Sequence, residues 1–334
     1  MKSLYTIYRP TKWDEVVGQE SIIKILKQQI ETSEIFNCMI FSGTSGTGKT
    51  TLARIFANEL NKGNGSPIEI DAASNNGVEN VRQVTATAVE RSLDSEYKVI
   101  IIDECHMMST AAWNAFLKCI EEPPYYTVFI FCTTDPHKIP ATIQNRCMRF
   151  NFSRVPSYLI EQRLNQICIA ENYENYGDVT NYISRICDGE VRKGISYLET
   201  CLRYDTELSV DNALKALGNS TYNDYFFIIN NLIDANRGEL IKKIDEIYNN
   251  GVDLKRFVDS FIEFTFDLLT YIECGNIRMT KIPDTYQSTL DFTIKFKDNV
   301  DYFNYFIDKL FILKNMEIDR ATVQIVFNQM SRFV

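Results

Sequence analysis

The chain has 334 residues with 35 basic and 44 acidic side chains, which gives a formal net charge of −9. This length exceeds what one hydrophobic core usually supports, so two or three domains are expected. The acidic balance excludes a uniformly basic surface for nucleic acid, although a local basic groove remains compatible with it. No stretch approaches about 18 consecutive apolar residues, and the N-terminus MKSLYTIYRP lacks the apolar segment of a secretory signal. We therefore expect a cytoplasmic protein with no membrane partner.

A glycine-rich segment lies between a strand-like run and a helix-like stretch, in the order CMIFS, GTSGTGKT and TLARIFANEL. The spacing G-x-x-x-x-G-K-[ST] in this setting predicts a loop that binds a polyphosphate through its backbone N–H groups and the N-terminus of the following helix. Lys49 would reach the β- and γ-phosphates, and Thr50 would bind Mg²⁺. A bare surface loop is the alternative, but such a match with these flanks is rare by chance. The predicted nucleotide-binding residues of the loop are Gly43, Thr44, Ser45, Gly46, Thr47, Gly48, Lys49, Thr50 and Thr51.

The next predicted strand, PIEID at residues 67–71, leads through an Asn/Gly turn into a helix. A second apolar run, VIIIDE at residues 99–104, is typical of a buried parallel strand and ends in two carboxylates. Asp103 would hold the Mg²⁺ shell through water, and Glu104 would polarise an attacking water. The alternative is an acidic pair at an exposed strand end, which the phosphate-binding loop upstream disfavours.

The stretch STAAWNAFLKCIEE carries apolar residues at helical spacing and is followed by two prolines, which end the helix. The apolar run TVFIFC at residues 127–132 comes next and predicts another strand. Strands that alternate with helices in this way form a parallel sheet with both faces covered. We therefore predict an α/β nucleotide-binding domain over residues 1–155.

The remaining sequence has helical patterns throughout. Residues 156–219 hold three amphipathic stretches with a break at Gly189, and residues 220–334 repeat helix–turn–helix units. One stretch in the last part, DLKRFVDSFIEFTFDLLTYIECG, is rich in Phe and Leu. Its apolar stripe fits either the core of this region or a face for partner subunits, and the sequence leaves both open.

Several blocks occur in the order found in one known family: YRPTKWDEVVGQE, GTSGTGKTTLARIFANEL, IEIDAASNNGVENVR, TTDPHKIPATIQNRC and GEVRKGISYLET. Through these blocks the chain resembles the gamma/tau ATPase subunits of the bacterial clamp loader, part of DNA polymerase III. The resemblance implies an α/β P-loop AAA+ domain with a five-stranded parallel sheet. It also implies a helical lid over residues 156–219 and an all-α collar over residues 220–334, which assembles subunits into a ring, expected to be a pentamer.

The same resemblance implies roles for three further polar residues. Thr134 corresponds to the residue that senses the γ-phosphate at the end of a strand, and Arg192 to an arginine that reaches phosphate from the lid. Arg146 corresponds to the arginine finger that a subunit offers to its neighbour's γ-phosphate. By themselves these residues would be interpreted as a turn residue, a helix-start arginine and a solvated arginine. The predicted catalytic residues are Lys49, Asp103, Glu104, Thr134, Arg146 and Arg192.

Adenine recognition is expected from the N-terminal block, as a mostly apolar slot closed by backbone hydrogen bonds. Its residues are Tyr8, Arg9, Pro10, Val16, Val17 and Gly18. The alternative is that these N-terminal residues only lead into the first helix and do not bind adenine.

Contact with primer–template DNA is expected through the duplex backbone, without base readout. The candidate segment is ASNNGVENVR, where Ser74, Asn75 and Asn76 precede a helix and Arg82 lies on it. An ordinary N-cap turn is the alternative.

Two features depart from the family pattern. Bacterial gamma/tau subunits insert a cysteine-rich zinc-binding module after the P-loop helix, whereas here NKGNG leads directly into PIEID, and Asn145 replaces the serine of the S-R-C motif. The nine cysteines include no C-x-x-C pair, and neither His106 nor His137 has a ligand-spaced partner. We expect reduced cysteines and no zinc, with ATP and Mg²⁺ as the cofactors. The chain stops at Val334 without a basic or Pro-rich tail, so we expect a compact gamma-like form from a phage or another minimal system.

The resemblance thus implies an ATP-dependent motor subunit that opens a sliding clamp, together with other clamp-loader subunits, and loads it on primer–template DNA. One alternative is another AAA+ DNA remodeller, such as a Holliday-junction helicase motor or a helicase loader. Another is a non-hydrolysing scaffold subunit like the delta-prime component. Intact Lys49, Thr50, Asp103 and Glu104 argue against the scaffold.

Overall fold

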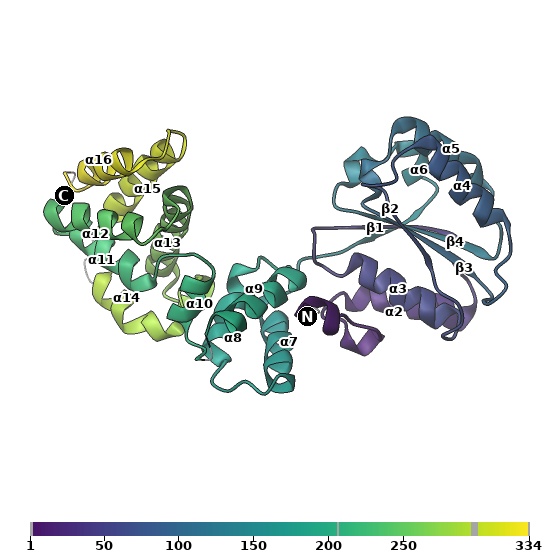
Figure 1. Ribbon diagram of the computed structural model, residues 1–334, viewed down its shortest axis with the longest axis horizontal. Helices are drawn as coiled ribbons and strands as arrows, with labels where there is room; N and C mark the ends of the chain where they lie inside the picture. Colours follow the sequence, from purple (N-terminus) through teal and green to yellow (C-terminus); the bar gives the residue numbers. More distant parts are fainter. Residues whose placement is uncertain (1–2, 206, 295–299, 333–334) are drawn as a thin grey trace. The chain divides into compact units, whose positions relative to one another are not determined.

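The computed structural model describes residues 3–205, 207–294 and 300–332. It comprises two compact units (Figure 1). One unit consists of Met1–Arg163 with Cys187–Ile195, and the other of Leu164–Ile186 with Ser196–Val334. The division into domains at residues 155 and 219 stays a prediction.

The first unit is built on a parallel sheet of five strands, as the sequence and its family resemblance predict. The spatial order of the strands is β2-β3-β4-β1-β5. Each predicted strand is present, and a fifth strand forms beside β1. The bounds are β1 (Cys38–Ser42), β2 (Ile68–Asp71), β3 (Lys98–Asp103), β4 (Thr127–Thr133) and β5 (Met148–Asn151).

Helices cover both faces of this sheet (Figure 1). The helices α2 (Glu20–Thr32) and α3 (Lys49–Leu60) lie on one face, and α4 (Val78–Val89), α5 (Thr110–Glu121) and α6 (Ala141–Gln144) lie on the other. Alternate residues of each strand point to opposite faces, so the two faces have separate apolar cores. Because both faces are buried, the central strands β1, β3 and β4 are nearly continuous apolar runs, which explains the sequence pattern.

The carboxyl ends of the strands meet at one edge of the sheet. Ser42 at the end of β1 pairs in register with Thr133 at the end of β4, and Asp71 at the end of β2 pairs with Asp103 at the end of β3. The loops that follow β1, β3 and β4 therefore emerge side by side. In open parallel sheets, this edge is where ligands bind.

Short helices complete the first unit around this edge. They are α1 (Leu4–Ile7), η1 (Trp13–Glu15), η2 (Cys105–Met107) and η3 (Pro136–Lys138). The helices α7 (Ser157–Ala170) and α9 (Val191–Tyr204) each contribute residues to both units.

The second unit is helical. Besides parts of α7 and α9, its α-helices are α8 (Gly177–Ile186), α10 (Val210–Ala216), α11 (Tyr222–Ile233), α12 (Arg237–Asn249), α13 (Leu254–Cys274), α14 (Gln287–Thr293), α15 (Val300–Lys314) and α16 (Arg320–Met330). Two short turns, η4 (Ile277–Met279) and η5 (Asp284–Tyr286), connect α13 to α14.

The Phe-rich helix α13 is mainly a core element. Phe257, Phe261 and Phe264 are almost fully buried and pack with aromatic rings of α11 and α16, including Phe327. Phe266, in contrast, is 45% exposed and lies against Phe311 of α15. Of the two interpretations that the sequence left open, the core accounts for most of this stripe. No helix in the described part of the chain is long and apolar enough to cross a membrane.

Candidate nucleotide-binding site

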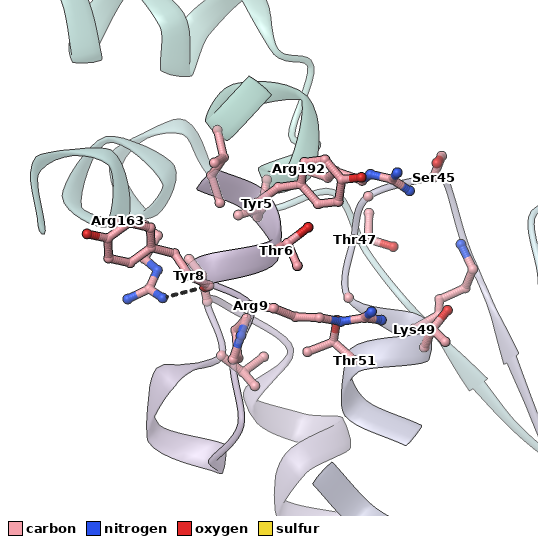
Figure 2. A pocket seen from close by; sticks show the side chains of 18 of the residues that line it. Tyr5, Thr6, Tyr8, Arg9, Ser45, Thr47, Lys49, Thr51, Arg163 and Arg192 are labelled. Atoms are coloured by element: carbon pink, nitrogen blue, oxygen red, sulfur yellow. Dashed lines mark hydrogen bonds between the residues drawn. The ribbon is translucent and has the colours of Figure 1, made fainter. Parts of the chain in front are cut away.

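A cavity of about 460 Å³ lies at the carboxyl edge of the sheet, entirely within the first unit. Figure 2 labels side chains from four regions of the sequence around it: the N-terminal segment, the P-loop with α3, helix α7, and the start of α9. The lining residues are Tyr5, Thr6, Tyr8, Arg9, Pro10, Val16, Val17, Ser45, Gly46, Thr47, Gly48, Lys49, Thr50, Thr51, Asp103, Glu104, Arg163, Val191, Arg192 and Ile195.

The P-loop folds tightly at one end of this cavity. Gly43 has a φ of 154°, and its Cα lies so close to the residue after β5 that an added Cβ would be 2.5 Å from the carbonyl oxygen of Phe152. Helix α3 follows, with Gly48 as an N-cap that has no side chain to accept from the first N–H groups. Those N–H groups and the helix dipole are therefore available for an anionic ligand.

Lys49 is almost fully buried within the loop. Its Nζ donates hydrogen bonds to the carbonyl oxygens of Gly43 at 2.8 Å and Thr44 at 2.9 Å. Burial lowers the pKa of Lys49, while the nearby Asp103 and Glu104 carboxylates act in the opposite direction. The structure thus places a cation at the loop, and the backbone carbonyls hold its ammonium group.

Thr50 and Asp103 meet across the cavity floor. Thr50 Oγ1 donates to Asp103 Oδ2 at 2.8 Å, and Asp103 Oδ1 accepts from the backbone N–H of Glu104 at 3.0 Å. Hydroxyl and carboxylate oxygens are the ligands that Mg²⁺ prefers, so this donor set fits the predicted metal. Among the described residues, no three His, Cys, Asp or Glu side chains gather into a further metal-binding group, and the absence of zinc stays a prediction.

Glu104 lies directly after β3 with its backbone in the left-handed region, at a φ of 46°. Its Oε2 is 3.4 Å from Thr134 Oγ1, which donates to it, and 3.3 Å from His106 Nδ1. Thr134 does not line the cavity, but it reaches the site through this carboxylate. The predicted sensing residue and the predicted base are therefore brought together.

The N-terminal block forms the other end of the cavity, and its role in adenine recognition stays a prediction. Five of its six predicted residues line the cavity, whereas Gly18 lies against Val155 outside the lining set. Arg9 Nε donates to Thr51 Oγ1 at 3.2 Å, and burial lowers the pKa of this guanidinium.

Sequence reasoning missed five lining residues: Tyr5, Thr6, Arg163, Val191 and Ile195. The Arg163 guanidinium donates to the carbonyl oxygen of Tyr8 at 2.8 Å (Figure 2). The Arg192 guanidinium lies 4.6 Å from the centre of the Tyr5 ring. Tyr5 lies near Arg9 in the sequence, and this could have suggested it as a lining residue. No local signal connects Arg163 with Tyr8, which lies 155 residues away.

Arg146 is not part of this cavity. Its guanidinium pairs with Glu121 at the end of α5 at 2.8 Å and donates to the carbonyl oxygen of Thr142 at 2.7 Å. Both members of the ion pair are about half exposed. A role in this chain's own site is therefore unsupported, whereas a role toward another subunit remains compatible with the geometry.

The four candidate DNA residues also lie outside the cavity, in the turn between β2 and α4 and on α4 itself. Ser74 Oγ donates to Asp71 Oδ2 at 3.2 Å, and Asn75 Nδ2 donates to the carbonyl oxygen of Asp71 at 3.1 Å. Arg82 pairs with Glu79 on the same helix at 3.5 Å. The N-cap of α4 is Gly77, so neither asparagine nor the serine caps this helix. Asn76 makes one backbone contact, accepting from Ser109 at 3.4 Å.

Residues 64–156 match a family model described as DNA polymerase III, delta subunit. DNA polymerase III subunit tau of Bacillus subtilis is 35% identical over 312 residues, which cover 86% of this chain and 55% of that protein. DNA polymerase III subunit gamma/tau of Mycoplasma genitalium is 33% identical over 316 residues, 88% of this chain and 52% of that protein. The chain spans about half the length of the curated relatives it matches.

Among solved structures, the RuvB Holliday junction branch migration motor of Thermotoga maritima is similar, with a TM-score of 0.54 and 18% sequence identity. The match covers 76% of this chain and 90% of that chain. At this identity the likeness concerns the AAA+ P-loop fold alone.

Proposed function

The chain belongs to the family of the DNA polymerase III gamma/tau subunits, and on that premise we propose that it is the ATP-hydrolysing motor of a clamp loader. In this role it binds Mg²⁺-ATP in the cavity of the first unit. With partner subunits, it opens a sliding clamp and places it on primer–template DNA during replication.

One observation carries this proposal: a single cavity joins the P-loop, the Thr50–Asp103 pair and the Glu104 carboxylate. A non-hydrolysing scaffold needs neither the acidic pair nor its connection to Thr134. The relatives that match most of the chain are polymerase subunits, whereas the likeness to RuvB supports only the fold.

Some residues of the proposed site bind the nucleotide and the metal, and Glu104 accepts a proton during hydrolysis. The N–H groups of the P-loop and Lys49 would bind the β- and γ-phosphates. Thr50 and Asp103 would hold Mg²⁺, which when bound would supply positive charge to neutralise the phosphates. Glu104 accepts a proton as water attacks the γ-phosphorus and ADP leaves with the electrons of the broken O–P bond. The cavity end formed by Tyr8, Arg9 and their neighbours holds the adenosine.

Two arginines complete the proposed site. Arg192, at the start of α9, lines the cavity and binds a phosphate of the nucleotide held in its own chain. Arg146 acts on the nucleotide of a neighbouring subunit, which is consistent with its half-exposed position outside the cavity. The helical parts of the chain act as the lid and as the collar of the ring. Contact of Ser74, Asn75, Asn76 and Arg82 with the DNA backbone is part of the same proposal.

Steady-state ATPase measurements on the purified chain test this function. The chain is assayed together with its partner subunits under four conditions: without additions, with primed DNA, with a bacterial sliding clamp, and with both. We expect stimulation by DNA and clamp together. Glu104→Gln should retain ATP binding and lose turnover, and Lys49→Ala should lose binding. An intact rate in both variants would contradict the site, and an ATPase indifferent to DNA and clamp would contradict the loader role.

A further inference from the structure

His106 is an enclosed polar side chain beside the site to which the hydrolysis scheme gives no role. It lies in η2, directly after Glu104, and only 13% of its side chain is exposed. Its Nδ1 is 3.3 Å from Glu104 Oε2 and 3.3 Å from Thr133 Oγ1 at the end of β4. A single ring nitrogen therefore joins the predicted base to the neighbouring strand.

The chemistry of its neighbours fixes which ring nitrogen carries the proton. An ionised carboxylate only accepts hydrogen bonds, so a bare Nδ1 lone pair facing Glu104 would be repelled. Thr133 Oγ1 accepts from the backbone N–H of Asp135 at 3.0 Å and can still either donate to or accept from Nδ1, so the carboxylate decides. The arrangement is satisfied when His106 carries its proton on Nδ1 and donates it toward Glu104.

Glu104 has little else to hold its side chain in one orientation. The side chain is 38% exposed, and an exposed glutamate loses rotamer entropy when it is fixed. Its Oε2 accepts from only two described side chains, Thr134 Oγ1 at 3.4 Å and His106 Nδ1 at 3.3 Å. The contact from Thr134 is the longer one and comes from a flexible hydroxyl. The ring of His106, enclosed between η2 and β4, is the more rigid of the two donors.

We propose that His106 is a positioning residue for ATP hydrolysis, which holds the Glu104 carboxylate in the orientation that activates water. The inference rests on the proposed function, because it matters only if Glu104 is the base. His106 does not line the cavity, whereas Glu104 does. Removal of the Nδ1 donor should therefore lower the rate of hydrolysis and leave the affinity for ATP unchanged.

Two substitutions of similar size and shape, His106→Asn and His106→Leu, distinguish a hydrogen-bonding role of His106 from a packing role. Asparagine places an N–H at a position close to that of Nδ1, and leucine has the same branched shape with no donor. A hydrogen bond to a charged group contributes about 1.5–3 kcal/mol, which corresponds to about 10- to 100-fold in rate. We expect His106→Leu to lose that factor in kcat, and His106→Asn to recover most of it. If His106 only fills space, the two variants should behave alike.

The experiment uses the full chain with partner subunits, primed DNA and a bacterial sliding clamp. It measures kcat for ATP and, separately, the dissociation constant of a fluorescent ATP analogue, with thermal melting as the control for folding. Should the leucine variant not fold, His106→Gln replaces it, because glutamine carries its N–H near the Nε2 position, where it does not meet Glu104. That variant should also hydrolyse slowly and bind normally.

A wild-type kcat in His106→Leu, equal rates in the Asn and Leu variants, or a parallel loss of affinity and rate would each overturn the inference. These outcomes leave the proposed function intact as long as Glu104→Gln abolishes turnover in the same series. If Glu104→Gln hydrolyses ATP like wild type, the assignment of the base fails, and the role of His106 fails with it.

Discussion

Replacement of Gly43 by alanine should destabilise the first unit and weaken ATP binding together. The P-loop leaves β1 at this residue, and its backbone is fixed on both sides. Gly43 N–H donates to the carbonyl oxygen of Thr133 at 3.2 Å, while Phe152 N–H donates to the carbonyl oxygen of Ser42 at 2.7 Å. The new Cβ would lie 2.5 Å from the carbonyl oxygen and 2.8 Å from the Cβ of Phe152.

The cost has two parts. The φ of 154° is in a region that residues with a Cβ rarely adopt, which costs about 1–3 kcal/mol. Relief of the close contacts requires a shift of about 1 Å, and such overpacking typically costs about 1–3 kcal/mol. The total of about 2–6 kcal/mol corresponds to a fall in Tm of about 4–24 °C for a unit of this size. Because the carbonyl oxygen of Gly43 also accepts from Lys49, the shift should weaken ATP binding by at least about tenfold.

Thermal melting and titration with a fluorescent ATP analogue measure the two effects. Gly77→Ala is the matched control, since Gly77 has a φ of −82° and an added Cβ there would meet no atom within 4 Å. Gly77 is the N-cap of α4, where alanine is less favoured than glycine, so we expect the control to lower stability by no more than about 1 kcal/mol. If Gly43→Ala melts and binds ATP like wild type, close contact with Phe152 is not the reason that residue 43 is glycine.

Three further predictions follow from individual contacts. Thr50→Val should weaken ATP binding about tenfold in Mg²⁺ and leave it unchanged in EDTA, because the hydroxyl serves the metal; equal weakening in both media would contradict this. Arg146→Ala should lower the DNA- and clamp-stimulated ATPase by about 10³-fold with ATP affinity unchanged, and mixing it with Lys49→Ala subunits should restore part of the activity; no restoration in confirmed mixed assemblies would exclude action in trans. Burial raises the pKa of Asp267 to about 6, above its unfolded value, so stability present below about pH 4 is lost as pH rises through about 6. Asp267→Asn should therefore be more stable than wild type at pH 7.5, by about 2–3 kcal/mol in urea unfolding, with the gain gone at pH 4; a variant less stable at both pH values would contradict the desolvation argument.

The sequence predicted those parts of the fold that local chemistry decides. The buried strands are continuous apolar runs because helices cover both faces of the sheet, and the P-loop has fixed spacing because its glycines and Lys49 are neighbours along the chain. Parallel strands bring Asp103 to the same edge as the loop, which is why two separate motifs indicated one site.

The remainder of the site depends on contacts between distant segments. Arg163 meets Tyr8 across 155 residues, and Arg146 meets Glu121 only because α5 ends near α6. No periodicity or motif specifies such pairs. The sequence shows His106 only as a candidate metal ligand, because its link to Thr133 depends on the register of β4 beside β3.

The most direct test of the central claim is clamp loading itself. Labelled sliding clamp is incubated with primed circular DNA, ATP and the chain together with partner subunits, and the clamp retained on the DNA is measured after gel filtration. We expect retained clamp with the wild-type chain and none above background with Lys49→Met, whose fold should be unchanged in thermal melting. Equal retention with both proteins, or no retention with a wild-type chain that hydrolyses ATP, would contradict the claim that hydrolysis at this site drives clamp loading.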